Sequence, residues 1–406
     1  MDLASEPDEI SAIARALEIA PAIAFDLEFA SADRLVPQLC LVQVSWVSEK
    51  QHRMFDAPDA EIVAITPEIR LLDPLAGDVA PVISVLAKHP CVIAHAPRQD
   101  LALLASRFGT ETMPGLVDTQ LEAAFAGAGD QVGLANLAND LLGTNLGKDQ
   151  QWTAWEKRPL TPAQLAYAAS DVRYLHALHV LLSKKLGPKA AWAKEESQQI
   201  LADALAAVRV TPETAWEQVG GARVLEPDAQ ARVKVLAQWR QETAIELDRP
   251  LGQVLGEKNL LELARHRPRD VGEIRAQKGI APIAKTRAAE ILAAIERAVV
   301  DPKAARADKP RAASARAQRW AEMLLAIAHV IGDEQQLAAR LLATRGDAET
   351  FARIADERGV DATVQLPARA TWRRDLLGAA WVGWLTGSVA IVGDSSTARG
   401  VSLVSR

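Results

Sequence analysis

Residues 21–29 constrain the fold more than any other part of the chain, because this short apolar run carries two acids. Its sequence, Pro-Ala-Ile-Ala-Phe-Asp-Leu-Glu-Phe, is rich in strand formers. Successive side chains of a strand point to opposite faces, so Asp26 and Glu28 share one face, with Cα atoms about 6.5–7 Å apart. Neighbouring carboxylates repel each other and lose hydration, and a cation between them removes both costs. The run predicts either a metal site or an edge strand with one solvated face.

A second acid, Asp100, follows another strand-like segment. Residues 91–95 indicate a buried strand, and residues 98–108 carry apolar residues at helical spacing. Asp100 then falls in the first turn of a helix, where the helix dipole favours an acid whether or not a metal is bound. We expect His95 to be a core histidine or to steady the turn, and not to bind a metal.

A third acid, Asp171, lies four residues after Tyr167 in a long predicted helix. Thr161 and Pro162 have the residue types of an N-cap and a first helical position, and apolar positions continue to Leu182. Residues four apart share one helical face. A phenol beside a carboxylate can position a water at a metal-bound phosphate. Alternatively, the acid is only a hydrogen-bond partner for a partly buried tyrosine.

Length and composition predict a globular protein of two or three domains. The chain has 406 residues, of which 49% are hydrophobic and 24% charged. Its two cysteines, Cys40 and Cys91, lie in strand-like runs and form no disulfide framework or zinc motif. The acidic N-terminus is no signal peptide, and the uncharged residues 376–392 are shorter than the ~20 residues of a membrane span. We therefore expect a monomeric cytoplasmic protein that does not contact membranes.

The formal net charge of −6 is unusual for a protein that binds nucleic acid, but its distribution is uneven. Residues 1–225 hold 18 Lys and Arg against 29 Asp and Glu, and residues 226–320 hold 19 against 13. Residues 321–406 are nearly balanced, with 9 against 10. The basic middle segment predicts either a phosphate-backbone contact or an ordinary solvated helical surface.

The hydrophobic patterns change along the chain. Residues 21–110 alternate strand and helix patterns, and residues 117–208 are nearly all helical, which predicts an α/β fold with a mixed sheet covered by helices. From residue 226, short helices separated by polar loops predict a compact all-α bundle. Residues 301–317 are rich in Ala, Arg, Lys and Pro, the composition of a mobile linker.

In this order, the three acidic segments resemble the motifs of DEDD-type 3′→5′ exonucleases of the subclass with Tyr in the last motif, and most closely the ribonuclease D family. The matching segments are Pro-Gln-Leu-Cys-Leu-Val-Gln (37–43), Asp-Thr-Gln (118–120), Gln-Val-Gly-Leu-Ala (131–135), Leu-Leu-Gly (141–143), Trp-Glu-Lys-Arg-Pro-Leu (155–160) and Tyr-Ala-Ala-Ser-Asp-Val-Arg-Tyr-Leu (167–175). The resemblance covers about residues 20–185 and implies a ribonuclease-H-like sheet.

The later part of the chain resembles a helicase-and-RNase-D C-terminal (HRDC) domain, through Trp-Arg (239–240), Asp-Arg-Pro (248–250) and Leu-Leu-Glu-Leu-Ala (260–264). A weaker match at residues 372–378 implies a second, diverged copy of this domain. The predicted division is an exonuclease domain at 1–208, a linker at 209–225, an HRDC domain at 226–302, a linker at 303–317, a second HRDC-like domain at 318–395 and a frayed tail at 396–406.

The resemblance implies phosphodiester hydrolysis with two divalent cations, Mg²⁺ or Mn²⁺, about 3.5–4 Å apart. By this resemblance, Asp26 contacts both cations, Glu28 and Asp171 one, and Asp100 the second, partly through water. Tyr167 orients the attacking water. Ligands that are all carboxylates also favour these cations over zinc.

The implied substrate is RNA, with removal of 5′-mononucleotides from the 3′ ends of tRNA precursors and other small structured RNAs. Candidate RNA contacts are basic residues, namely Arg158, Arg265, Arg267, Lys278 and Lys285. A DNA exonuclease and a non-catalytic RNA-binding protein are the alternatives. Two segments depart from the family: residues 151–155 lack its usual Arg and Asp, and residues 51–73 form an additional strand-loop-strand excursion.

Overall fold

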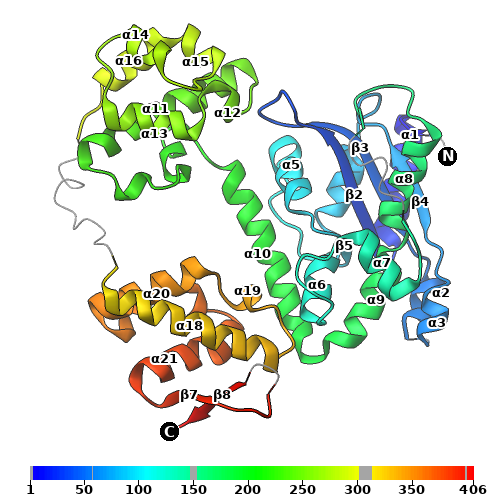
Figure 1. The fold of residues 1–406 in the computed structure, drawn as a ribbon. Helices are drawn as coiled ribbons and strands as arrows, with labels where there is room; N and C mark the ends of the chain where they lie inside the picture. The colour runs from blue at the N-terminus through cyan, green and yellow to red at the C-terminus, as the bar shows by residue number, and fades with distance from the viewer. Residues whose placement is uncertain (1–2, 57, 147–152, 301–312, 398–399) are drawn as a thin grey trace.

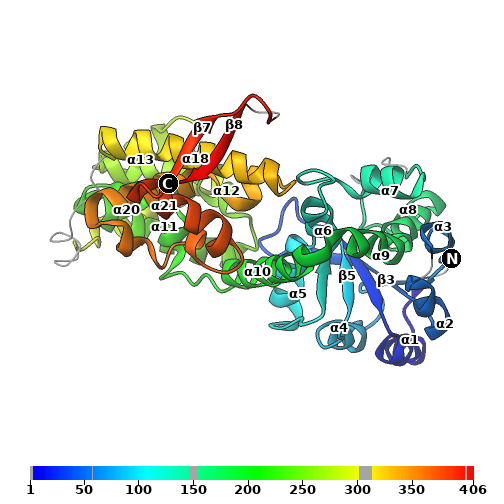
Figure 2. The same ribbon diagram turned by 90° about the horizontal axis from the view of Figure 1, so that it is seen from below.

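The computed structural model describes residues 3–56, 58–146, 153–300, 313–397 and 400–406 (Figure 1). We divide these residues into an N-terminal unit (3–208), a middle unit (211–300) and a C-terminal unit (313–397 and 400–406). The N-terminal unit contains the main sheet and ends in the long helix α10 (Ala190–Val208), which leads to the middle unit. Figure 2 shows both later units on the side of α10 that faces away from the sheet.

The main sheet is mixed, as the sequence predicts. Its strands, in the spatial order β1-β4-β3-β2-β5-β6, are β1 (Leu3–Ala4), β4 (Glu68–Leu72), β3 (Gln38–Trp46), β2 (Ile23–Ala30), β5 (Val92–Ala94) and β6 (Leu116–Asp118). Strand β3 runs antiparallel to both neighbours, whereas β2, β5 and β6 are parallel to one another. The pairing of β2 with β3 is irregular between Glu28 and Phe29, immediately after the second predicted ligand.

Helices cover both faces of this sheet. The helices of the N-terminal unit other than α10 are α1 (Pro7–Ile19), α2 (Glu49–His52), α3 (Asp59–Ile62), α4 (Ala80–Leu86), α5 (Arg98–Phe108), α6 (Thr119–Phe125), α7 (Leu134–Leu142), α8 (Pro162–Arg173) and α9 (Leu175–Leu186). Helices α1, α4, α5 and α10 pack on the face that buries Phe25, while α8 and α9 pack on the face that buries Ala24. Since side chains alternate, Asp26 and Glu28 face α8.

The predicted long helix from Thr161 is two helices, which corrects the sequence interpretation. Helix α8 begins as expected, with a capping box between Thr161 and Gln164 and with Pro162 in its first turn. It ends at Arg173, and α9 starts after Tyr174, whose backbone departs from ideal helical angles. The apolar positions continue across this one-residue interruption, so periodicity alone did not reveal it.

The middle unit is the predicted all-α bundle, but the predicted linker at 209–225 is wrong for most of its length. The unit contains η3 (Ala215–Gln218), η4 (Ala222–Val224), α11 (Pro227–Leu247), α12 (Leu251–Val254), α13 (Glu257–His266), α14 (Val271–Ala276), α15 (Pro282–Thr286) and α16 (Ala288–Glu296). Ala215, Val219 and Ala222 are buried in the core of this bundle. Their burial makes this segment part of the unit, although Gly220 and Gly221 suggest a flexible boundary.

The C-terminal unit is helical and closes with a two-stranded sheet. Its main elements are α18 (Ala315–Glu334), α19 (Ala339–Leu342), α20 (Arg345–Arg358), α21 (Ala379–Thr386), β7 (Val389–Gly393) and β8 (Val401–Ser405). The frayed tail predicted at 396–406 is wrong, because β8 pairs with β7 along five residues. The linker predicted at 303–317 lies mostly outside the described residues, and its last residues already belong to α18, which Ser314 caps.

The excursion at residues 51–73 folds as short helices before β4, where the sequence analysis expected a strand-loop-strand. The first of them, α2, has a capping box made by Ser48 and Gln51. Ile62 and Ile65 are buried against the α8–α9 face of the sheet. None of the helices in the described part of the chain is long and apolar enough to cross a membrane.

Candidate active site

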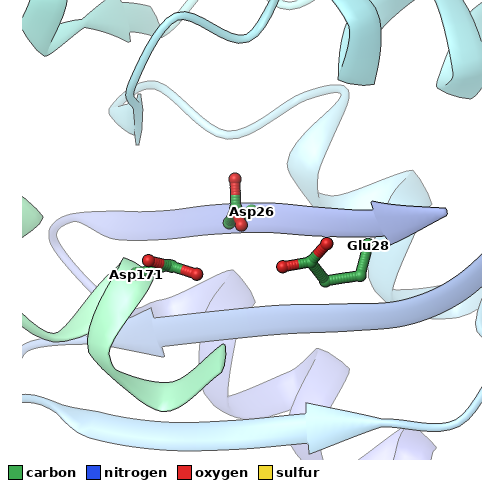
Figure 3. A group of neighbouring side chains, drawn as sticks. All are labelled: Asp26, Glu28 and Asp171. Carbon is green, nitrogen blue, oxygen red and sulfur yellow. The ribbon is translucent and has the colours of Figure 1, made fainter. Parts of the chain in front are cut away.

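The three predicted acidic segments meet at one end of the sheet. Asp26, Glu28 and Asp171 each place a carboxylate oxygen within 4.8 Å of the others (Figure 3). Figure 3 shows the carboxylates of Glu28 and Asp171 turned towards one another beside Asp26. The strand register produces this cluster, since β2 directs its even-numbered side chains towards α8 and α8 carries Asp171 on its sheet-facing side.

Asp100 and Tyr167 complete the set. Asp100 is in the first turn of α5, as predicted, and is buried. It is not part of the three-carboxylate cluster but lines the same cavity of about 960 Å³, together with Tyr167. The ring centroid of Tyr167 lies 6.2 Å from that of the buried Trp155. Thus all five predicted residues border one cavity. Asp100 comes from α5, which packs on the opposite face of the sheet from α8.

The carboxylates strongly disfavour their own ionisation. Burial raises the pKa of Asp26 to about 7, and burial followed by the charge of Asp26 raises that of Asp171 to about 9. The pKa of Glu28 is raised to about 9 by burial and by the charges of the three other acids. Burial and the charge of Asp26 also raise the pKa of Asp100 well above its ordinary value. Without a counterion the cluster therefore takes up protons near neutral pH.

These residues fit a divalent cation. Oxygen ligands at close range from several carboxylates suit hard cations, and a bound cation removes the repulsion that raises the pKa values. The described residues that line the cavity include no Lys or Arg. A bound divalent cation would neutralise this acidic cavity for a polyanion such as a nucleic acid, so the cluster is a candidate divalent-metal site.

Two polar residues, Gln43 and His95, hold the site in place, and Gln43 was given no role from the sequence. Gln43 lies opposite Asp26 on β3, and its Nε2 donates a long hydrogen bond of 3.4 Å to the Asp26 carboxylate. His95 links Thr119 to the Val132 carbonyl, with Nε2 3.0 Å from that oxygen. Burial lowers the pKa of His95 to about 4, so it is a neutral histidine that steadies the turn, as expected.

The Asp-Thr-Gln segment at 118–120 explains part of this arrangement. Asp118 caps α6 and also accepts a hydrogen bond from the Ala96 amide, in the turn between β5 and α5. Gln120 donates to the Val132 carbonyl and lines the cavity. The segment was recognised only as a family motif, because its contacts join residues that are distant in the chain.

The predicted RNA contacts are not among the described residues that line this cavity. None of the five basic residues lines it, and Arg158 instead donates two hydrogen bonds, of 2.6 and 2.7 Å, to Asp73. Arg265 is 3.8 Å from Glu262. Arg267, Lys278 and Lys285 form no ion pair with the described residues, so their charges are available to a ligand.

The altered segment at 151–155 does border the cavity. Residues 151 and 152 lie outside the described residues, but Thr153, Ala154 and Trp155 line the cavity. Thr153 accepts a hydrogen bond from Gln164, which connects the segment to the capped start of α8. The described residues of this altered segment are therefore part of the candidate site.

Known proteins with the same organisation identify the family. A model described as a 3′-5′ exonuclease matches residues 2–187, and an HRDC domain model matches residues 229–295. Ribonuclease D of Granulibacter bethesdensis is 31% identical over 393 residues, which are 93% of this chain and 90% of that protein. The chain belongs to the ribonuclease D family.

Other ribonuclease D proteins agree over nearly the whole chain. That of Zymomonas mobilis is 30% identical over 403 residues, covering 96% of this chain and 95% of its own. The crystal structure of Escherichia coli RNase D, described as an exoribonuclease involved in structured RNA processing, matches with a TM-score of 0.79 and 25% identity. The match covers 95% of this chain and 99% of that chain. This ribonuclease D family member is accordingly a 3′→5′ exoribonuclease that contains an HRDC domain.

Proposed function

We propose that this protein trims the 3′ ends of tRNA precursors and other small structured RNAs, with Asp26, Glu28, Asp100 and Asp171 holding two divalent cations. The convergence of three carboxylates within 4.8 Å from two elements distant in sequence carries the proposal. Mg²⁺ and Mn²⁺ are the cations that suit such ligands. Two cations bound there would supply an activated water and would stabilise charge on the leaving 3′ oxygen.

The residues of the chain have distinct parts in this reaction. Asp26, from β2, lies beside both Glu28 and Asp171, and Asp100 comes from α5. Tyr167 holds its phenolic proton at neutral pH, because burial followed by the charges of Asp171 and Glu28 raises its pKa. We assign to this hydroxyl the orientation of the attacking water. The buried ring of Trp155 beside it limits the positions that the phenol can take.

We divide the work between the units as follows. The exonuclease domain at 1–208 performs cleavage, and the helical units at about 211–300 and 313–406 hold the body of the RNA. Arg267, Lys278 and Lys285 are the phosphate contacts best supported by the structure, because they form no ion pair with the described residues. Arg158 and Arg265 have acidic neighbours. Their contact with RNA, the monomeric state and the cytoplasmic location stay predictions from the sequence.

A gel time course tests the function. A 3′-extended tRNA labelled at its 5′ end is incubated with the protein and Mg²⁺, with Mn²⁺ or with chelator, beside an Asp26→Ala variant and a DNA oligonucleotide. We expect a ladder that shortens from the 3′ end of the RNA, requires the metal and is absent in the variant. Shortening of DNA alone would support a DNA exonuclease, and RNA binding without shortening would support a binding protein.

A further inference from the structure

One wall of the active-site cavity continues into a loop that is held by contacts from both the N-terminal and the C-terminal unit. Residues 126–133, here the 126–133 loop, join α6 to α7 and have the sequence Ala-Gly-Ala-Gly-Asp-Gln-Val-Gly. Gly127, Gly129 and Gln131 have positive φ angles of 83°, 110° and 53°. A segment this rich in glycine loses much conformational entropy when it is ordered. Contacts from outside the loop must therefore hold it in one conformation.

The end of the loop belongs to the active site. The Val132 carbonyl accepts hydrogen bonds from His95 and Gln120, at 3.0 and 3.2 Å. The next three residues, Gly133, Leu134 and Ala135, line the cavity. A displacement of the loop would therefore move both the wall beside the carboxylates and the partner of His95.

The C-terminal unit contacts the earlier part of the loop and the end of α6. Arg340 of α19 donates two hydrogen bonds to the Asp130 carboxylate, at 2.6 and 2.9 Å. Lys189 donates to the carbonyls of Phe125 and Gln335, at 3.2 and 2.5 Å, and so joins the end of α6 to the C-terminal unit. Gly127 also lies close to the C-terminal unit, because a Cβ atom added to it would be 3.4 Å from the carbonyl oxygen of Gln336.

A hydrophobic core shared by the N-terminal and C-terminal units fixes the position of these contacts. Phe125 is fully buried in the hydrophobic core of the C-terminal unit. Its ring contacts that of Trp372 edge to face at 5.2 Å, and Trp372 stacks on Trp192 of α10 at 5.1 Å. Glu196 of α10 accepts hydrogen bonds from Trp372 and Arg373. The C-terminal unit is thus anchored on α10 and reaches the loop from a defined position.

We propose that the C-terminal unit positions the active-site wall by holding the 126–133 loop, with Arg340 acting on Asp130 as a positioning residue for the RNA strand. This inference rests on the proposed function, because it concerns how the same cavity receives its substrate. Arg340 does not touch the carboxylate cluster. It acts through the loop, so its loss changes how the substrate is held and leaves the chemical step in place.

The test is a charge-swap series in the full-length protein. The variants are Arg340→Asp, Asp130→Arg and the double variant that exchanges the two charges. Arg353→Asp is the matched control, since Arg353 pairs with Glu357 on α20 of the same unit at 3.2 Å. Amide hydrogen exchange of the 126–133 loop and steady-state cleavage of a single-stranded oligoribonucleotide are measured for each protein.

We expect each single swap at the 130–340 pair to accelerate exchange in the loop and to raise KM about fivefold, which corresponds to about 1 kcal/mol. The turnover number should change by less than about twofold, the double variant should recover both properties, and the control should match the wild type. Unchanged exchange in the loop, or a fall in kcat with no rise in KM, would overturn the inference. A wild-type protein that cleaves no RNA would instead refute the proposed function, while the exchange rates would still decide whether the pair holds the loop.

Discussion

Replacement of Glu28 by Gln should stabilise the metal-free protein while it destroys the active site. The carboxylates of the cluster lie within 4.8 Å of one another, and two unit charges at that largest separation repel by about 3.5 kcal/mol at an effective dielectric constant of 20. The pKa of Glu28 is about 9 in the folded protein against an ordinary value of 4.5. The folded protein therefore keeps a proton that the unfolded chain releases, and its stability falls as the pH rises from about 4.5 towards 9.

The size of the effect follows from the same shift. At pH 8, roughly 3.5 units above the ordinary pKa of 4.5, keeping Glu28 protonated lowers the free energy of unfolding by up to about 5 kcal/mol, at about 1.4 kcal/mol per unit. Solvent in the cavity screens part of this cost, which leaves about 2–4 kcal/mol. Since Gln needs no proton, Glu28→Gln should raise the melting temperature of the N-terminal unit by about 6–12 °C at pH 8 in chelator. At pH 5 the two proteins should differ by less than about 2 °C.

The assay is calorimetry of the wild type, Glu28→Gln and Glu18→Gln at pH 5, 6.5 and 8, with chelator and with Mg²⁺ or Mn²⁺. Glu18 is an exposed residue of α1 in the same unit and serves as the control. Cation should stabilise the wild type at pH 8 and stabilise Glu28→Gln much less. Equal melting temperatures of the wild type and Glu28→Gln at pH 8 in chelator would refute the reasoning that burial of Glu28 and repulsion from its acidic neighbours limit stability.

Two further substitutions test other parts of the site. Tyr167→Phe should lower the turnover number about 100-fold and leave the affinity for Mn²⁺ unchanged in titration calorimetry, because in the proposed mechanism the phenol orients water and does not bind the metal; normal turnover would remove Tyr167 from the mechanism. Arg158→Ala should destabilise the protein by about 3–5 kcal/mol in thermal unfolding, because it leaves Asp73 buried without its partner. An unchanged melting temperature would show that this ion pair does not secure the end of β4.

The sequence predicted the elements that carry the site because local signals specify them. The alternation in residues 21–29 predicted a strand with Asp26 and Glu28 on one face, and the structure places both in β2 facing α8. The Thr161–Pro162 pair predicted the start of α8, and the structure shows a complete capping box there. The pattern from residue 98 predicted α5 with the correct bounds and with Asp100 in its first turn.

The interpretations that were wrong concern segments whose structure depends on distant partners. The 209–225 segment has the glycines of a linker, yet Ala215, Val219 and Ala222 are small enough to enter the core of the middle unit. The alternating Val-Ser-Leu-Val-Ser sequence at 401–405 is a strand pattern that the prediction of a frayed tail overlooked, and β7 supplies its pairing edge. The pairing of Arg158 with Asp73 was not foreseen for the same reason, because it joins two residues 85 positions apart.

By itself, the sequence determined which residues are the candidates for the chemistry, since a carboxylate in a strand or at a helix start is specified by its near neighbours. Only the tertiary structure decided their distances, their pKa values and the absence of Lys and Arg among the described residues that line the cavity. It alone showed that the C-terminal unit reaches the 126–133 loop through Arg340 and Asp130. Such contacts join residues 210 positions apart, and their geometry is set by the packing of whole units, which no local pattern records.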